Sequence, residues 1–491
     1  MHPFFSTLHL TKGDAAALYL QLAKQLTAAI TEGILLPATQ LPGSRYLAQL
    51  LSVHRKTVIR AYDDLLAQGW LESKTGSGTF VAGHLPVIKP EKLGKKIQNT
   101  GDPLLIAGFH FEQADHLARK FIKEQTSYHL DDGFPDARLA PLHDLSRAYR
   151  TQLIMGNTYH RLGYDDPQGS AWLREQLAAH FSETRGMKVT EDNILITRGT
   201  VMGLYLASTA LIRPGDNVVA AAPGWTSANN NFLQAGANLL QIAVDEYGIN
   251  TDELEKICKK KNVRMVYVTS HHHYPSSVSL RVERRIQLLQ LSSKYGFIIF
   301  EDDYDYDFHY LNKPLSPLAS ADEAGTVLYC GSFTKTISPA FRVGYLVGSA
   351  NVIAQLARLR RIVDRQGDTM LDNAMAELLQ NGIIQRHLRK SLRVYRQRRD
   401  TFCNLLKSEL NSYLNFVLPE GGLAVWTTFE PAIDLVKLAK EARKKDLSFS
   451  DGKIHRSPFY QLNSTRLGFA SSNLDELAQS VDILKRLLTN H

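Results

Sequence analysis

Residues 14–82 follow a helical pattern of apolar and polar positions that ends in a strand-like hairpin. Apolar residues recur every four positions from Leu18 to Ile30, which predicts an amphipathic helix that ends at Gly33. Two further helical segments are expected between residues 44 and 68. Two short strand-like runs then flank a glycine-rich turn at residues 76–78. The pattern predicts a compact unit of three helices and a β-hairpin.

Residues 84–128 interrupt this pattern. Their first half is rich in proline, glycine and lysine, a composition typical of a linker. A helix is expected within residues 111–125, at the start of the next unit. We therefore expect a first domain at residues 1–83, a linker at 84–128 and a second domain at 129–491.

Beyond the linker, helical patterns alternate with short apolar β-type runs. The runs lie at residues 193–197, 217–223, 265–270, 297–302, 326–333 and 343–349. Apolar strands that alternate with helices predict an α/β domain with a mostly parallel sheet and helices on both faces. From about residue 385 to 491, helices surround a separate strand, GLAVWTTF, which predicts a smaller α+β lobe.

Length and composition narrow the class of protein. With 491 residues the chain exceeds what one hydrophobic core usually organises, in agreement with several domains. No apolar run approaches the roughly 20 residues that span a bilayer, and the first residues lack a signal-peptide layout, so we expect a cytoplasmic protein with no membrane partner. The three cysteines have neither disulfide nor metal-ligand spacing and are expected to be buried. The net charge of +8 suits a nucleic-acid partner only if the positive charge is clustered.

Chemically suggestive side chains follow five of the apolar runs. Ligands of open α/β sheets bind beyond the carboxyl ends of the strands, so these positions are the first candidates for a site. They are Arg198–Thr200, Trp225, the polar aromatic cluster at 271–275, the acidic segment at 301–307, and Lys335.

Lys335 has two interpretations. On its own it fits a solvated surface residue. Alternatively, a buried lysine with a lowered pKa forms a Schiff base with pyridoxal phosphate, whose chemistry also needs a phosphate cup, a carboxylate for the pyridinium nitrogen and a flat group over the ring. Candidates for these three parts are present: Gly199, Thr200, Ser332, Thr334 and Arg342 for the cup, Asp302 for the carboxylate and Trp225 for the ring face. This combination favours the cofactor interpretation.

From about residue 130 onward, the chain resembles fold-type I pyridoxal-phosphate enzymes of the aminotransferase family. The segment GSFTKTISPAFRVGY is similar to the family's S-x-S-K-x-x-x-P-x-x-R-x-G-Y. The resemblance implies that Lys335 is the Schiff-base lysine and that Ser332 and Arg342 bind the phosphate.

Other segments extend this resemblance. FIIFEDDYDYDF is similar to the strand whose aspartate pairs with the pyridine nitrogen, a role that we assign to Asp302, with Asp303 as its nearest competitor. Tyr304 then lies on the same strand face as Asp302 and reaches the cofactor O3′. The remaining matches imply that Trp225 stacks on the ring, that Tyr274 stands where the family has an asparagine near O3′, and that Arg466 binds an effector α-carboxylate through its bidentate guanidinium.

The N-terminal unit resembles the winged helix-turn-helix of GntR-type bacterial regulators. The matching features are the LPGSR start, the segment RKTVIRAYDDL and the GSGTFV wing. Positive charge alone would fit a solvated helix face equally well, but the motif spacing favours DNA binding. Residues placed to read bases in the major groove are Arg55, Lys56, Thr57 and Arg60. Residues placed to bind phosphates are Ser44, Arg45, Lys74 and Ser77.

A GntR head joined to an aminotransferase-like body resembles the MocR/GabR family of transcriptional regulators. The resemblance implies a homodimer, domain-swapped so that each head packs on its partner's body, whose heads bind paired half-sites of a double-stranded DNA operator. It also implies pyridoxal 5'-phosphate as cofactor and an amine, amino-acid or vitamin B6 effector that acts by aldimine exchange at Lys335. Two alternatives stay open: an active aminotransferase with an accessory DNA-binding head, and a sensor of pyridoxal phosphate itself. Any transaminase activity is expected to be weak or vestigial.

The chain departs from its relatives at several positions. Ser227 stands where the GABA-responsive branch has an arginine, so that branch's γ-amino-acid clamp is not expected here. Ser277 replaces the glycine of the aminotransferase Asn-Pro-Thr-Gly loop. The consecutive residues His271, His272 and His273 point to alternate faces of an extended segment, so we expect no metal site.

Overall fold

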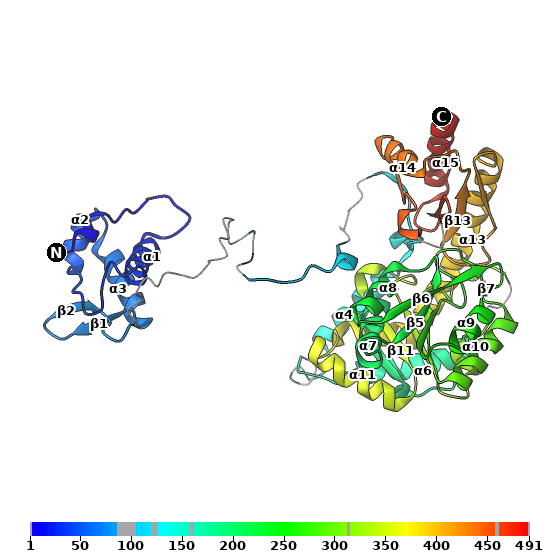
Figure 1. Cartoon of the computed structure of the whole chain (residues 1–491), viewed down its shortest axis with the longest axis horizontal. Helices are drawn as coiled ribbons and strands as arrows, with labels where there is room; N and C mark the ends of the chain where they lie inside the picture. Colours follow the sequence, from blue (N-terminus) through cyan, green and yellow to red (C-terminus); the bar gives the residue numbers. More distant parts are fainter. Residues whose placement is uncertain are drawn as a thin grey trace. The chain divides into compact units, whose positions relative to one another are not determined.

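The computed structural model places two compact units, Met1–Gln113 and Ala114–His491 (Figure 1). It describes residues 2–85, 105, 107, 109–118, 126–157, 159, 162–311, 315–456 and 461–489. We call residues 2–85 the head and residues 114–491 the body. Most of the linker expected at 84–128 lies outside the described residues, as does the second half of the helix expected at 111–125. The described part of that segment holds a single 3-10 turn, Asp115–Leu117.

The head consists of three helices and a hairpin, which confirms the sequence-based prediction. Its elements are α1 (Leu18–Thr31), α2 (Ser44–Leu50), α3 (Arg55–Ala67), β1 (Leu71–Lys74) and β2 (Gly78–Val81). One face of α1, with Leu22 and Leu26, packs against Val58 and Leu65 of α3 in one buried core. β1 and β2 pair antiparallel, and Gly76 in the turn has φ of 76°, a conformation that favours glycine.

An eight-stranded sheet forms the centre of the body in the order β4-β11-β10-β9-β8-β5-β6-β7. These strands are β4 (Ile194–Thr197), β5 (Asn217–Ala222), β6 (Asn238–Asp245), β7 (Gly248–Ile249), β8 (Val263–Val268), β9 (Ile298–Asp303), β10 (Val327–Ser332) and β11 (Gly344–Val347). All six apolar runs form strands of this sheet. The strands from β10 to β6 pair in parallel, whereas β11 runs antiparallel to both of its neighbours, in agreement with the mostly parallel sheet that was predicted. β6 and β7 were not predicted from the sequence.

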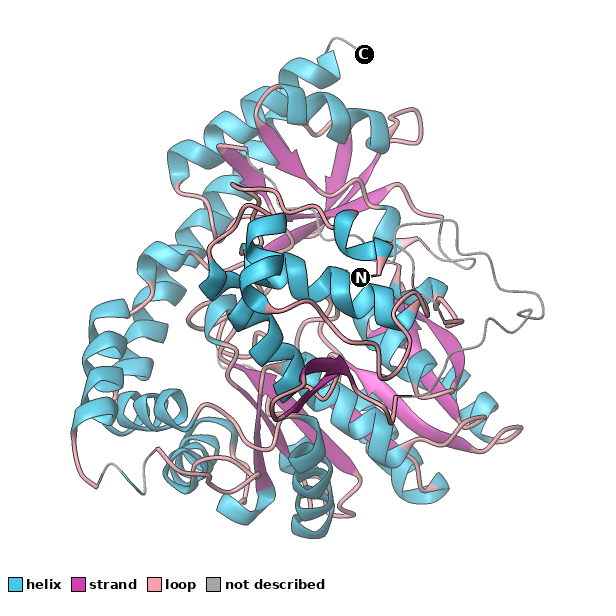
Figure 2. Ribbon diagram, turned by 90° about the vertical axis from the view of Figure 1, so that its left-hand side faces the viewer, coloured by secondary structure: helices cyan, strands magenta, loops and turns pink. Residues whose placement is uncertain are grey.

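Helices cover both faces of this sheet (Figures 1 and 2). The body helices are α4 (Leu142–Ile154), α6 (Ala171–Arg185), α7 (Thr200–Leu211), α8 (Thr226–Gln234), α9 (Thr251–Cys258), α10 (Val282–Tyr295), α11 (Ala350–Val363), α12 (Thr369–Gln380), α13 (Ile383–Glu409), α14 (Leu435–Lys444) and α15 (Leu474–Thr489). Alternation along the strands sorts the side chains: Leu195 and Phe300 pack with α7, α8 and α11, whereas Ile196 and Ile299 pack with helices of the opposite face.

The small lobe has its own three-stranded antiparallel sheet, in the order β12-β13-β15, and helices α13, α14 and α15. Its strands are β12 (Leu414–Phe416), β13 (Ala424–Phe429), β14 (Leu447–Phe449) and β15 (Ser464–Gly468). β14 pairs in parallel with β3 (Tyr128–Leu130), so the first described strand of the body joins a lobe that was expected only from about residue 385.

Short 3-10 helices complete the described structure, at Pro3–Ser6, Asp115–Leu117, Ala137–Leu139, Glu191–Asn193, Leu318–Ala321, Pro339–Phe341 and Lys453–His455. All three cysteines are buried and free, as expected. Within the described ranges, no helix combines the length and the apolar character that crossing a membrane requires.

Candidate functional site

A cavity of about 300 Å³ lies beyond the carboxyl ends of the parallel strands of the body. Nine of the predicted cofactor residues line it: Thr200, Trp225, Tyr274, Asp302, Tyr304, Ser332, Thr334, Lys335 and Arg342. These residues come from five separate strand ends and helix starts, which only the fold brings together. We call this cavity the pocket.

Lys335 follows β10 and reaches into the pocket. Its Nζ donates a hydrogen bond of 2.7 Å to the carbonyl of Gly133 and lies 4.6 Å from the centre of the Phe134 ring. Burial lowers the pKa of Lys335, and the positive charge of Arg466 acts in the same direction, while Asp132 opposes both. The amine is therefore easier to deprotonate than a lysine in water, as a nucleophilic amine requires.

Asp302 and Asp303 face opposite sides of β9. Asp302 lines the pocket, and its Oδ2 accepts a hydrogen bond of 2.7 Å from Tyr267, whereas its buried Oδ1 has no partner among the described residues. Burial raises the pKa of Asp302 to about 7. The carboxyl group thus has an unused oxygen at the pocket, which suits a cationic nitrogen on a ligand.

Asp303 points to the opposite face of the sheet, where it joins a polar cluster with Tyr329 and His271. Its Oδ2 accepts a hydrogen bond of 2.7 Å from Tyr329 and lies 3.3 Å from Nδ1 of His271. Burial by itself would raise the pKa of Asp303, but the charges and hydrogen bonds of His271, Arg185 and Tyr329 lower it to about 2. Strand alternation therefore separates a pocket carboxyl from a structural carboxylate at adjacent positions.

The N-terminus of α7 forms one end of the pocket. Its free backbone N–H groups and helix dipole favour an anion there. Gly199 precedes the helix with φ of 76°, and a Cβ at this position would lie 2.9 Å from Nη2 of Arg342. Glycine is thus required both by the backbone conformation and by the approach of the guanidinium, which also donates to the carbonyl of Arg198 at 2.8 Å. Ser332 and Thr334 line the same pocket.

Three aromatic side chains of the pocket, Trp225, Tyr304 and Tyr274, differ in their surroundings and hydrogen-bond partners. Trp225 is the residue before α8 and is half-buried. The Tyr304 hydroxyl donates to the carbonyl of His272 at 2.9 Å, and the Tyr274 hydroxyl donates to Oδ2 of Asp132 at 2.8 Å. Both tyrosine hydroxyls thus have protein acceptors, so a role at the cofactor O3′ stays a prediction for each.

Arg466 on β15 is buried, 2% exposed, and does not itself line the pocket. Its Nη1 donates to the carbonyl of Pro275 at 2.9 Å, and its Nε lies 3.0 Å from Oδ1 of Asp132. The guanidinium predicted to bind an effector carboxylate is therefore already paired with a carboxylate of the same chain.

The three consecutive histidines are buried and have separate partners. His271 lies against Asp303, Nδ1 of His272 lies 2.8 Å from Oδ1 of Asp305, and Nδ1 of His273 lies 2.9 Å from the Ser276 hydroxyl. Among the residues that the structure describes, no group of His, Cys, Asp or Glu is arranged to hold a metal ion.

Sequence reasoning missed five residues that line the pocket: Asp132, Phe134, Val201, Tyr267 and Thr269. Alternation along the strand run that ends in YVTS would have placed Tyr267 and Thr269 on one face. Asp132 and Phe134 carried no such signal, because they follow β3 and reach the pocket only through the pairing of that strand with the small lobe.

In the head, the predicted DNA-contacting residues form a polar surface at the start of α3 and on the hairpin. Arg45, Arg55, Lys56, Arg60, Lys74 and Ser77 are exposed, while Ser44 and Thr57 are half-exposed. The first turn of α3 is basic, although positive charge at a helix N-terminus is electrostatically unfavourable. A bound anion would remove that penalty, which supports phosphate contacts at this surface.

Several contacts hold this surface in place. Nε of Arg55 donates to the Ser44 hydroxyl at 3.2 Å, which ties α3 to α2. The Arg60 guanidinium lies 4.0 Å above the Tyr19 ring of α1. His54, which sequence reasoning missed, caps α3 by accepting from the N–H of Lys56 at 3.2 Å.

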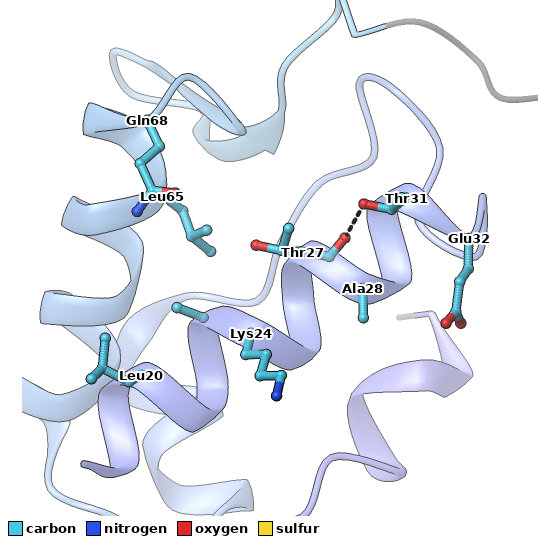
Figure 3. A pocket seen from close by; sticks show the side chains of 9 residues that line it. Leu20, Lys24, Thr27, Ala28, Thr31, Glu32, Leu65 and Gln68 are labelled. Atoms are coloured by element: carbon cyan, nitrogen blue, oxygen red, sulfur yellow. Dashed lines mark hydrogen bonds between the residues drawn. The ribbon is translucent and has the colours of Figure 1, made fainter. Parts of the chain in front are cut away.

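Figure 3 shows a separate depression of about 570 Å³ on the head, lined by side chains of α1 and of the C-terminal end of α3. Its lining includes Leu20, Lys24, Leu65 and Gln68. Leu65 and Gln68 lie at the end of α3 opposite to Arg55, so the depression is distinct from the candidate DNA-binding surface.

Two family models match this chain. Residues 135–484 match aminotransferase class I and II, and residues 18–81 match bacterial regulatory proteins of the gntR family. Among curated relatives, the probable rhizopine catabolism regulatory protein MocR of Rhizobium meliloti is 28% identical and the alignment covers 95% of this chain and 93% of that protein. The HTH-type transcriptional regulator TauR of Rhodobacter capsulatus is 29% identical, with 94% and 96% covered.

The body also matches solved aminotransferases. A kynurenine aminotransferase of Pyrococcus horikoshii shares 26% sequence identity with a TM-score of 0.68, and the match covers 74% of this chain and 91% of that one. The aminotransferase class I and II fold implies dependence on pyridoxal phosphate. The chain therefore belongs to the aminotransferase class I and II family, as a MocR-type member in which a GntR-type DNA-binding domain precedes the aminotransferase-like domain.

Proposed function

We propose that this protein is a pyridoxal-phosphate-dependent transcriptional regulator. Its head binds a double-stranded DNA operator, and its body senses a small amine or amino acid at Lys335. The observation that carries the proposal is the coexistence in one chain of a basic helix-turn-helix surface and a pocket that joins Lys335, Asp302 and the N-terminus of α7. The full-length relatives MocR and TauR, which are named as regulators, support the same conclusion.

The residues of the pocket fit pyridoxal phosphate part by part. The unpartnered Oδ1 of Asp302 would hold the pyridinium nitrogen, and Trp225 would cover the ring. The α7 N-terminus with Thr200, Ser332, Thr334 and Arg342 would hold the phosphate. When bound, the cofactor supplies an aldehyde that reacts reversibly with primary amines.

The residues around Lys335 adapt it to that task. Burial keeps a larger share of its amine in the neutral, nucleophilic form, and the carbonyl of Gly133 orients Nζ. An effector amine would compete with Lys335 for that aldehyde. The Lys335 side chain would then be held in one position without effector and released from that position when effector binds.

Release of Lys335 alters DNA binding only if the effector prefers one of two body conformations, because a ligand shifts an equilibrium solely through its differential affinity. We propose a homodimer whose two heads meet two operator half-sites, with each head packed on its partner's body, so that a change in the bodies alters the spacing of the heads. The effector's effect on DNA affinity is then the coupling free energy between the two sites.

The test uses the purified full-length protein and DNA from the region upstream of its own gene. Fluorescence anisotropy of labelled DNA and absorbance of the cofactor are followed while a panel of amines and amino acids is added. We expect at least one ligand to change the absorbance and to shift the DNA dissociation constant by about 5- to 150-fold. Sustained oxo-acid production with unchanged DNA affinity would instead show an active aminotransferase with an accessory head.

A further inference from the structure

A carboxylate of the same chain, Asp132 at the pocket, pairs with the buried guanidinium of Arg466 behind it. Oδ1 of Asp132 lies 3.0 Å from Nε of Arg466, and Oδ2 of Asp132 accepts a hydrogen bond of 2.8 Å from the Tyr274 hydroxyl. Tyr274 also lies under the guanidinium, with its ring centre 5.0 Å from Cζ of Arg466. Asp132 thus has an ion-pair contact at one oxygen and a hydrogen bond at the other.

The backbone around Asp132 is fixed by its neighbour. Oδ1 of Asp131 accepts hydrogen bonds from the N–H groups of Gly133 and Phe134 at 2.9 and 2.8 Å. Oδ2 of Asp131 accepts from the Ser471 hydroxyl at 2.6 Å, and the carbonyl of Asp131 accepts from the N–H of Gly468 at 2.8 Å. This turn is thus anchored to the small lobe at the end of β15 and just after it, and it holds Asp132 against Arg466.

A ligand carboxylate could reach Arg466 only by displacing Asp132. The Arg466 side chain is 2% exposed and the Asp132 side chain 36% exposed, so Asp132 forms the side of the pair that is open to solvent and the pocket. Displacement breaks a largely buried ion pair and the Tyr274 hydrogen bond, and it leaves a second negative charge beside the incoming one. An amine that lacks this carboxylate can bind without breaking the Asp132–Arg466 ion pair or the Tyr274 hydrogen bond.

We propose that Asp132 is a specificity-determining residue, which makes the pocket selective for primary amines without a carboxylate on the carbon that bears the amino group. This inference rests on the proposed function, because it names the class of ligand that competes with Lys335. It reverses the ranking of ligands expected if Arg466 binds an effector α-carboxylate.

The experiment compares ligand pairs that differ only in the α-carboxylate: phenethylamine with L-phenylalanine, isoamylamine with L-leucine, and 1,4-diaminobutane with L-ornithine. Dissociation constants are measured on the full-length holoprotein by absorbance titration and by calorimetry. For pairs whose side chain fits the cavity, we expect the amine to bind about tenfold or more tightly than its amino acid. The readout is the ratio of the two dissociation constants within each pair, because changes at Lys335 affect the amine and the amino acid equally.

The variant Asp132→Asn tests the residue directly. Asparagine keeps the size of the side chain but removes the negative charge, so the amino acids should gain affinity while the amines change little, and the ratio should fall by about tenfold or more. Tyr274→Phe removes one of the two contacts of Asp132 and should lower the ratio by a smaller factor. Asp144→Asn is the matched control, since Asp144 forms an exposed ion pair with Arg147 on α4 and does not line the pocket.

The outcomes separate this inference from the proposed function. If amines and amino acids both change the cofactor absorbance but the amino acids bind as tightly in the wild-type protein, Asp132 does not select against the carboxylate and the inference is overturned. An unchanged ratio in Asp132→Asn overturns it as well. If no ligand of either class alters the cofactor absorbance or binds calorimetrically, the amine-sensing function itself fails.

Discussion

The head and the body place similar charged side chains in opposite environments. Lys56 and Arg55 are exposed at the start of α3, whereas Lys335 and Asp302 lie in a pocket where burial shifts the pKa of each. The electrostatic effect of an exposed charge is screened by salt beyond a distance of about 8–10 Å at ionic strengths of about 0.1–0.15 M. A buried group acts through its few direct partners, so its chemistry depends on the surrounding fold.

The two regions should therefore respond differently to substitution. Substitution of one basic residue of the head removes one contribution out of several. In the body, substitution of a single buried group leaves its partners without a counterpart, and the effect is larger.

Lys335→Ala should abolish covalent attachment of the cofactor. The purified variant should show no absorbance band of bound cofactor after borohydride treatment and dialysis, while its head still binds DNA. Lys294→Ala, an exposed lysine of α10 that pairs with Glu255, is the control and should keep the band. A band that survives in Lys335→Ala would refute the assignment of the Schiff-base lysine.

Asp303→Asn should destabilise the body far more than Asp302→Asn in the cofactor-free protein. Asp303 is the anionic partner of His271 and Tyr329, so its loss leaves buried groups unpaired and should cost about 3–5 kcal/mol of the free energy of unfolding. Urea denaturation followed by fluorescence measures the difference. Equal losses in both variants would show that the two faces of β9 are not distinct.

The pH dependence should separate the same two carboxyl groups. The pKa of Asp302 is raised to about 7, so the folded state binds more protons than the unfolded state between about pH 4 and pH 7, and stability falls as pH rises through this window. Asp302→Asn removes this loss and should gain up to about 4 kcal/mol relative to the wild-type protein by pH 7.

The variant is compared with the wild-type protein at each pH, because Asp372 also has a pKa raised to about 7 and remains in both. Asp303 affects the pH dependence of stability in the opposite direction. Its pKa is lowered to about 2, so its contribution to the stability of the folded state is lost as pH falls from about 4 to 2. Parallel stability curves for Asp302→Asn and the wild-type protein would contradict the burial of an ionisable pocket carboxyl.

Arg55→Ala and Lys56→Ala should each weaken operator binding by about 1–3 kcal/mol, the smallest effect of the series. A residue that contacts phosphate should also reduce the slope of log affinity against log salt by about one. Lys24→Ala, an exposed lysine on α1, is the control. Anisotropy titrations at several salt concentrations measure both quantities, and unchanged slopes and affinities would mean that α3 does not contact DNA.

Sequence patterns predicted most of the elements. The four-residue apolar spacing from Leu18 located α1, and all six apolar runs of the body became strands. β6 was missed because Gln241 interrupts its apolar residues, in keeping with a strand of which only Ile242 is fully buried. The sequence of β11 resembles those of the parallel strands, because strand direction is set by how the chain connects and not by side-chain composition.

For the pocket, the sequence identified the groups that follow each strand, and the placement of Asp302 on the same strand face as Tyr304 followed from alternation alone. It could not identify Asp132. The signal was absent because the interaction joins Asp132, which follows β3, to Arg466 of β15, more than 300 positions away in the sequence.

By itself, the sequence determined the two-part organisation, the exposed basic surface of the head and the identity of the pocket groups, because local spacing and strand alternation decide which residues share a face. Only the tertiary structure decided which charges meet. The pairing of Asp132 with Arg466, the unpartnered oxygen of Asp302 and the lowered pKa of Lys335 all arise where distant segments exclude water from a common site. Burial and the distances between charges are properties of that packing, and they determine which ligands the pocket accepts.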